Sequence, residues 1–109
     1  MDKIPVYYSD KLSKFDFGPG HPFKGERFKS FIELLDRANI LQDCELISPV
    51  AASDEELALV HDTGYLEEIS KLRERDGWLT MDTPVTPGAN DAQRAIAGSA
   101  LQACKLLQD

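Results

Sequence analysis

The side chain best suited to acid–base chemistry in this sequence is His21, which lies in a glycine- and proline-rich stretch at residues 15–27. Glycine permits a positive φ and proline fixes φ, so the glycines and prolines around His21 predict a rigid bend. A residue before proline favours an extended backbone, so the His21 ring should project from this bend. Histidines in turns are more often structural hydrogen-bonding groups than catalysts, and both roles stay open for His21.

Two charged residues are further candidates for function. Arg27 shares a helix face with Phe31 and Leu34, which predicts a guanidinium at the inner edge of an apolar stripe. The alternative is a surface arginine whose stem covers its neighbours. Asp82 lies in the longest stretch without periodicity, residues 74–88, and long irregular loops in small domains usually carry function or are disordered. The alternative for Asp82 is a carboxylate satisfied by its own turn.

The remaining histidine and the two cysteines indicate structural roles. His61 and Tyr65 are predicted to be a packing and hydrogen-bonding pair, because no carboxylate or nucleophile accompanies them at a useful spacing. Cys44 and Cys104 stand alone, with no C-x-x-C pair, so they are interpreted as small buried residues rather than disulfide or zinc ligands.

Composition limits the class of protein. A chain of 109 residues has room for one domain, and its 42% hydrophobic and 28% charged residues are typical of a folded one. A net charge of −7 opposes general nucleic-acid binding and suits a cationic partner, although it also serves solubility. No apolar run approaches the ~20 residues of a membrane span and the N-terminus has no signal-peptide core, so we expect a cytoplasmic protein without membrane contact.

The first half of the chain predicts a strand, a helix and a second strand. Residues 4–8 are β-branched and aromatic, residues 10–17 form a loop, and residues 44–49 alternate in hydrophobicity. Between them a helix should run from about Pro22 or Lys24 to Ala38. Its core-facing stripe comprises Phe28, Phe31, Ile32 and Leu35. One right-handed crossover would make the two strands parallel neighbours.

The second half predicts three helices. Ser53 and Glu56 form a capping box for a short helix that ends at His61 and buries Leu57 and Val60. Asp62 or Thr63 caps the next helix, whose inward residues are Tyr65 or Leu66, Ile69 and Leu72. The last helix, residues 90–107, is rich in alanine and has apolar residues around much of its circumference, so it needs burial on more than one side.

Four blocks of sequence occur in an order that resembles one known family. They are VYYSD at residues 6–10, FGPGHPFKGER at 17–27, HDTGYL at 61–66 and MDTPV at 81–85. Together they resemble the N-terminal third of the histone deacetylase superfamily, including its acetoin-utilisation and polyamine deacetylase members. The resemblance implies an α/β chain: the N-terminal part of an arginase/deacetylase-like three-layer fold, with two short parallel strands and about four helices. Residues 1–109 would form one such segment.

The same resemblance implies a substrate site and a reaction. Family members use zinc to hydrolyse acetyl-lysine, acetylpolyamine or related amides, but the matching metal ligands and catalytic histidine pair lie C-terminal to this region. We therefore expect no zinc, no catalytic residue and no activity in this chain by itself. The substrate-binding residues implied are Gly20, His21, Phe23, Arg27 and Asp82. Asp82 would accept backbone N–H groups of the substrate at the rim, and Arg27 would line an internal cavity that binds released acetate.

Two classes of function follow. The chain is either the N-terminal piece of a zinc-dependent deacetylase, or an independent small acidic module that binds a partner through the surface the missing part would cover. We expect the chain to self-associate rather than remain a simple monomer. The helix at residues 90–107 should form the contact, because it and an unpaired strand edge would otherwise stay uncovered.

Overall fold

The computed structural model describes residues 2–108 and is a mixed α/β fold, as predicted. Its elements along the chain are β1 (Ile4–Tyr7), the 3₁₀ helix η1 (Asp10–Lys14), α1 (Glu26–Arg37), the 3₁₀ helix η2 (Leu41–Asp43), β2 (Cys44–Ile47), α2 (Asp54–Leu57), α3 (Thr63–Glu74), β3 (Trp78–Thr80), β4 (Thr83–Pro84) and α4 (Pro87–Gln108). The parallel pair β1–β2 and the antiparallel pair β3–β4 form two separate small sheets.

The β1–α1–β2 unit has the predicted topology. The strands are parallel neighbours, with Ile4 opposite Cys44 and Tyr7 opposite Ile47. The expected start of α1 at residue 22 or 24 is wrong, because the chain from 18 to 23 is held in turns and the helix begins only at Glu26. The expected loop at residues 10–17 contains η1, which buries the side chain of Leu12.

The caps of α2 and α3 are as predicted. The Ser53 hydroxyl accepts from the Glu56 backbone N–H at 3.1 Å, and the Glu56 carboxylate accepts from the Ser53 N–H at 2.9 Å. Asp62 caps α3 by accepting from the Gly64 N–H at 2.7 Å. The helix α4 starts at Pro87, three residues before the predicted start, because the Thr86 backbone carbonyl and hydroxyl satisfy the first N–H groups.

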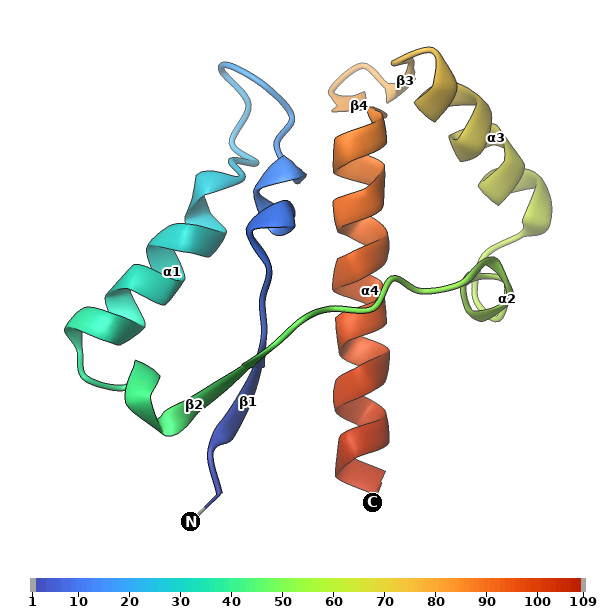
Figure 1. Ribbon diagram of the computed structural model, residues 1–109. Coiled ribbons are helices and arrows are strands. Elements are labelled where there is room, and N and C mark those ends of the chain that lie inside the picture. Colours follow the sequence, from blue (N-terminus) through green and yellow to red (C-terminus); the bar gives the residue numbers. More distant parts are fainter. Residues whose placement is uncertain (1, 109) are drawn as a thin grey trace.

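The long helix α4 is the centre of the arrangement (Figure 1). The β1–α1–β2 unit lies on one side of it and α2 with α3 on the other, and the connection from β2 to α2 crosses it. At the crossing the Ala52 N–H donates to the Arg94 carbonyl at 2.9 Å and the Val50 N–H donates to Gln102 Oε1 at 2.8 Å. A Cβ at Gly98 would overlap the Val50 carbonyl oxygen, so only glycine allows this approach.

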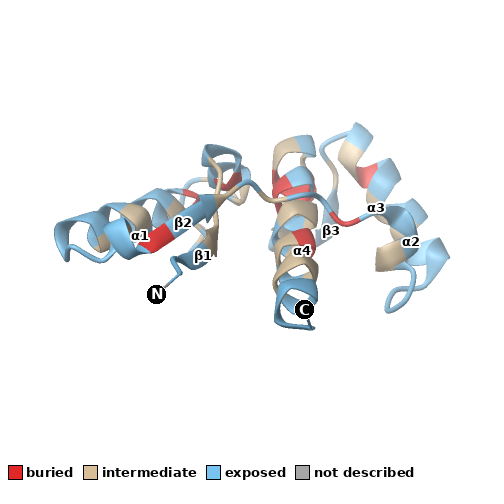
Figure 2. Ribbon diagram, turned by 60° about the horizontal axis from the view of Figure 1, so that its bottom comes forward, coloured by how far each residue is buried: buried red, intermediate tan, exposed pale blue. Residues whose placement is uncertain are grey.

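The core is small and the surface is large. The buried hydrophobic residues are Leu12, Cys44, Ala52, Leu72, Val85, Ala89 and Ala92, and Figure 2 shows them scattered as short red segments. The accessible surface is 7712 Å², compared with about 6,000 Å² for a compact chain of this mass. The radius of gyration is 15.7 Å, compared with about 13 Å for a compact domain. Extents of 45 × 36 × 16 Å describe a thin layer with much of its surface uncovered.

Several burial predictions are therefore wrong, and for one reason. Phe31 is 55% exposed although it belongs to the predicted inner stripe of α1, and Val60 beyond α2 is 84% exposed. Cys104 is exposed, whereas Cys44 is buried as predicted. Periodicity identified apolar positions on these helices, but the other elements of residues 2–108 cover those faces only in part. None of the helices in these residues combines the length and apolarity that a bilayer crossing needs.

Candidate functional site

The glycine- and proline-rich loop, residues 15–25, is locked by Asp16. Its two carboxylate oxygens accept the backbone N–H groups of Gly18 at 2.8 Å and Gly25 at 2.9 Å. The bond from Gly25, followed by that from Gly18, lowers the pKa of Asp16 below its ordinary value. Gly18 and Gly20 have φ values of +98° and +82°, which other residues rarely adopt, and Lys24 donates to the Gly18 carbonyl at 2.9 Å. The loop is therefore a rigid platform.

Asp16 was missed in the sequence interpretation. A signal was present, since an aspartate two residues before a glycine is a common start for a turn in which the side chain accepts a backbone N–H. Nothing local, however, indicated the second bond, which closes the loop across nine residues.

His21 joins this loop to the loop of Asp82, 61 residues further along the chain. Its Nε2 lies 2.9 Å from the Asp82 carbonyl oxygen, and its Nδ1 accepts the Phe23 backbone N–H at 3.1 Å. The two partners assign the tautomer: Nδ1 must be the acceptor, so Nε2–H is the donor. In Figure 1 both loops lie at the end of the molecule where α4 begins.

The Asp82 carboxylate is exposed and is oriented by its own turn. The hydroxyls of Thr80 and Thr83 lie 2.9 and 3.3 Å from its Oδ1, and these bonds, Thr80 first, lower the pKa of Asp82. Both hydroxyls contact the same oxygen, and Oδ2 receives neither. The turn-satisfied alternative thus describes Oδ1 of Asp82, whereas Oδ2 accepts no hydrogen bond from another side chain of residues 2–108.

Arg27 lies among aromatic rings. Its guanidinium carbon is 5.0 Å from the ring centre of Phe28, 5.6 Å from that of Phe15 and 5.9 Å from that of Phe23. Cations within about 6 Å of a ring face are attracted by its quadrupole. Within residues 2–108 no carboxylate pairs with Arg27, so the guanidinium keeps its charge and its donors available.

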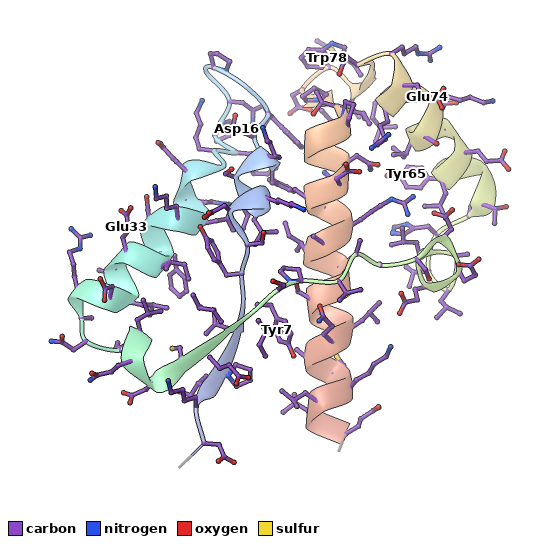
Figure 3. The ribbon with its side chains drawn as sticks, viewed as in Figure 1. Tyr7, Asp16, Glu33, Tyr65, Glu74 and Trp78 are labelled. Carbon is purple, nitrogen blue, oxygen red and sulfur yellow. The ribbon has the colours of Figure 1, made fainter. Side chains whose placement is uncertain are left out.

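A cavity of about 320 Å³ opens beside Arg27 between β1 and α1. It is lined by Val6, Tyr7, Tyr8, Leu12, Arg27, Phe28, Phe31 and Ile32. Figure 3 shows Tyr7 on β1, on the other side of the strand pair from Glu33 on the outer part of α1. Arg27 is the one charged residue of this lining. A small anion with an apolar tail would find both a cation and apolar walls here.

The five residues predicted for substrate binding come together. Asp82 is bonded to His21, the rings of His21 and Phe23 lie 5.2 Å apart, and Phe23 contacts Arg27. Gly20, which has a positive φ like Gly18, directly precedes His21 in the loop. The residues that the sequence interpretation missed are those that support this series: Phe15, Asp16, Thr80 and Thr83.

The other pair of interest, His61 and Tyr65, lies away from this site. Their rings are 5.5 Å apart, in agreement with a packing pair. Among residues 2–108 no hydrogen bond joins them. They line a cavity of about 260 Å³ between α2, α3 and α4, and Figure 3 shows Tyr65 on α3.

Across residues 2–108 no three side chains of histidine, cysteine, aspartate or glutamate gather closely enough to hold a metal ion. The donors of this part of the chain therefore do not fit a zinc centre.

Comparisons with known proteins agree with the family resemblance of the sequence. The family model described as "Histone deacetylase domain" matches residues 21–109. The acetoin utilization protein AcuC of Staphylococcus aureus strain MRSA252 is 36% identical over 93 residues, which cover 85% of this chain and 23% of that protein. AcuC of Bacillus subtilis strain 168 is 32% identical over 105 residues, covering 88% and 27%. The chain spans about a quarter of the length of these relatives.

Proposed function

Because this chain belongs to the histone deacetylase family, we propose that residues 1–109 form the N-terminal, substrate-facing segment of a deacetylase domain. The reaction is hydrolysis of an acetylated amine, either acetyl-lysine or an acetylpolyamine. Water adds to the amide carbonyl carbon, the C–N bond breaks, and acetate and an amine leave. Both amines are cationic, which suits a chain of net charge −7.

The observation that carries the proposal is the continuous series of contacts from Asp82 through His21 and Phe23 to Arg27. It supports two roles. The exposed Asp82 carboxylate accepts backbone N–H groups of the bound substrate at the rim. Arg27 binds the released acetate in the cavity between β1 and α1, where one charge-assisted contact contributes about 1.5–3 kcal/mol.

The family is zinc-dependent, and the zinc polarises the amide carbonyl and activates the water. The donor set of residues 2–108 does not fit that ion, and we assign no catalytic step to these residues. Their proposed work is to bind, orient and release. We propose that the chain alone does not turn substrate over.

Acetate binding tests the role of Arg27. Acetate and an acetyl-lysine peptide are titrated into ¹⁵N-labelled chain, and we expect shifts in residues 15–28 and 80–83. Arg27→Ala should weaken acetate binding by about ten- to a hundredfold, since one charge-assisted hydrogen bond of about 1.5–3 kcal/mol is lost. Arg37→Ala is the matched control, because Arg37 lies at the other end of α1. Equal acetate affinity in both variants would place Arg27 outside the acetate site.

We also propose that the chain self-associates. Its surface exceeds that of a compact chain by roughly 1,700 Å², and a standard interface needs only about 800 Å² from each partner. The contact is assigned to the exposed C-terminal turns of α4, where Leu106 is 48% and Leu107 86% exposed.

Light scattering at micromolar concentration tests self-association. We expect a mass above 12.1 kDa that Leu107→Glu reduces. Met81→Glu is the matched control, because this substitution adds the same charge at a position away from the C-terminal turns of α4. Met81 lies at the β3–β4 turn and is 99% exposed. A monomer with a cooperative unfolding transition would instead show that the chain covers its own core, and would favour the independent acidic module.

A further inference from the structure

The β3–β4 turn that carries Asp82 has few attachments to the rest of the protein. All three residues of β3 are exposed, β4 has two residues, and the pairing between them is irregular. Val85 N–H donates to Gly77 O at the base of the turn, and the bonds among Thr80, Asp82 and Thr83 stay inside it. Within residues 2–108, the hydrogen bond from His21 to the Asp82 carbonyl is the one that ties the turn to another part of the chain.

His21 is itself held firmly enough to serve as an anchor. Its own N–H donates to Gly18 O at 3.2 Å, and its Nδ1 accepts from Phe23 N–H. The His21 ring also packs against Phe17 at 5.0 Å, edge to face. Asp16 also closes the same loop through hydrogen bonds to Gly18 and Gly25. Contacts within the loop therefore fix the position of His21 Nε2 independently of its bond to the β3–β4 turn.

We propose that His21 is a positioning residue that fixes the Asp82 carboxylate at the substrate rim, by holding the Asp82 carbonyl. This role rests on the proposed function for the part played by Asp82. A fixed carbonyl holds the peptide plane at residue 82, and the bonds of Thr80 and Thr83 to Oδ1 then set the side-chain angle. The carboxylate is thereby pre-organised, and a site ordered in advance loses less entropy when substrate binds.

Two substitutions of His21 distinguish the acceptor role of Nδ1 from the donor role of Nε2. His21→Asn places a polar atom near the position of Nδ1, so it keeps the acceptor for Phe23 and loses the donor to Asp82. His21→Gln places its amide nitrogen near the position of Nε2, so it keeps the donor to Asp82. His61→Gln is the matched control, because His61 lies away from this turn, in the cavity between α2, α3 and α4.

The readout is the ¹⁵N order parameter of residues 80–83, measured without substrate. In the wild type we expect values near the ~0.85 of rigid backbone; in His21→Asn they should fall toward ~0.6, and in His21→Gln and His61→Gln they should stay high. Acetyl-lysine peptide affinity should follow the same order, with a loss of about fivefold in His21→Asn, the size expected for one neutral hydrogen bond.

The outcomes are distinguishable. Unchanged order at residues 80–83 in His21→Asn overturns the inference, and so does a loss of order that also extends through residues 16–25, which would be a general structural role. A mobile turn with unchanged peptide affinity would show that His21 holds the turn but does not position a substrate carboxylate. Absence of peptide binding in the wild type would instead count against the proposed function, while the order parameters would still decide whether His21 anchors the turn.

Discussion

Replacing Gly98 with alanine tests the crossing on which the arrangement depends. The backbone at residues 50–52 lies so close to α4 that a Cβ at position 98 would overlap the Val50 carbonyl oxygen and crowd the Ala52 nitrogen. Because the obstacle is backbone, it cannot move aside as a flexible side chain would. The connection must shift away from the helix, and the bonds from Ala52 to Arg94 and from Val50 to Gln102 are strained or lost.

The expected cost can be worked from these contacts. Overpacking costs about 1–3 kcal/mol, and two neutral hydrogen bonds contribute about 1 kcal/mol each. The higher helix propensity of alanine stabilises the folded state by about 1 kcal/mol relative to glycine. The net loss in the free energy of unfolding is therefore about 2–4 kcal/mol. For a domain of this size that lowers Tm by roughly 10–20 °C.

Urea unfolding followed by far-UV circular dichroism measures this loss. Gly64→Ala is the control, because a Cβ there would meet only the Asp62 side chain at 3.1 Å, and we expect little change or a slight gain. If Gly98→Ala fails to fold while Gly64→Ala folds, the reasoning holds in a stronger form. A Gly98→Ala chain as stable as the wild type would refute it, and would mean that the connection does not lie on α4 in solution.

Two further predictions concern acid and metal. The hydrogen bonds to Asp16 hold its folded pKa below the ordinary 3.8, so the stability they contribute is present above that value and is lost as pH falls through the folded pKa. Acid titration should therefore destabilise the wild type more than the Asp16→Asn variant. The control, Asp36→Asn, should behave as the wild type. Parallel stability curves for all three proteins would contradict the role of the Asp16 carboxylate in closing the loop. After dialysis the chain should hold no stoichiometric zinc by elemental analysis and should not deacetylate an acetyl-lysine peptide; one retained zinc per chain, or turnover lost on chelation, would overturn that expectation.

Local patterns in the sequence determined the elements and the family. The capping box of Ser53 and Glu56 and the cap at Asp62 involve residues two or three positions apart, so their chemistry is visible in the sequence. The parallel pair β1–β2 followed from one strand–helix–strand unit, since a crossover of this length leaves few topologies. The family resemblance likewise depended on the order of short blocks, and the match over residues 21–109 confirms it.

The tertiary structure alone decided what the site residues touch. The partner of His21 lies 61 residues away, and no periodicity or propensity specifies which carbonyl a projecting ring will reach. The guanidinium of Arg27 lies within 6 Å of three aromatic rings, two from the loop and one from α1, whereas the sequence placed it only at the edge of a stripe. The exposure of Phe31 and the need for glycine at 98 arise in the same way. Burial and close approach depend on which element lies over a face, and that is a property of the packed chain rather than of any segment.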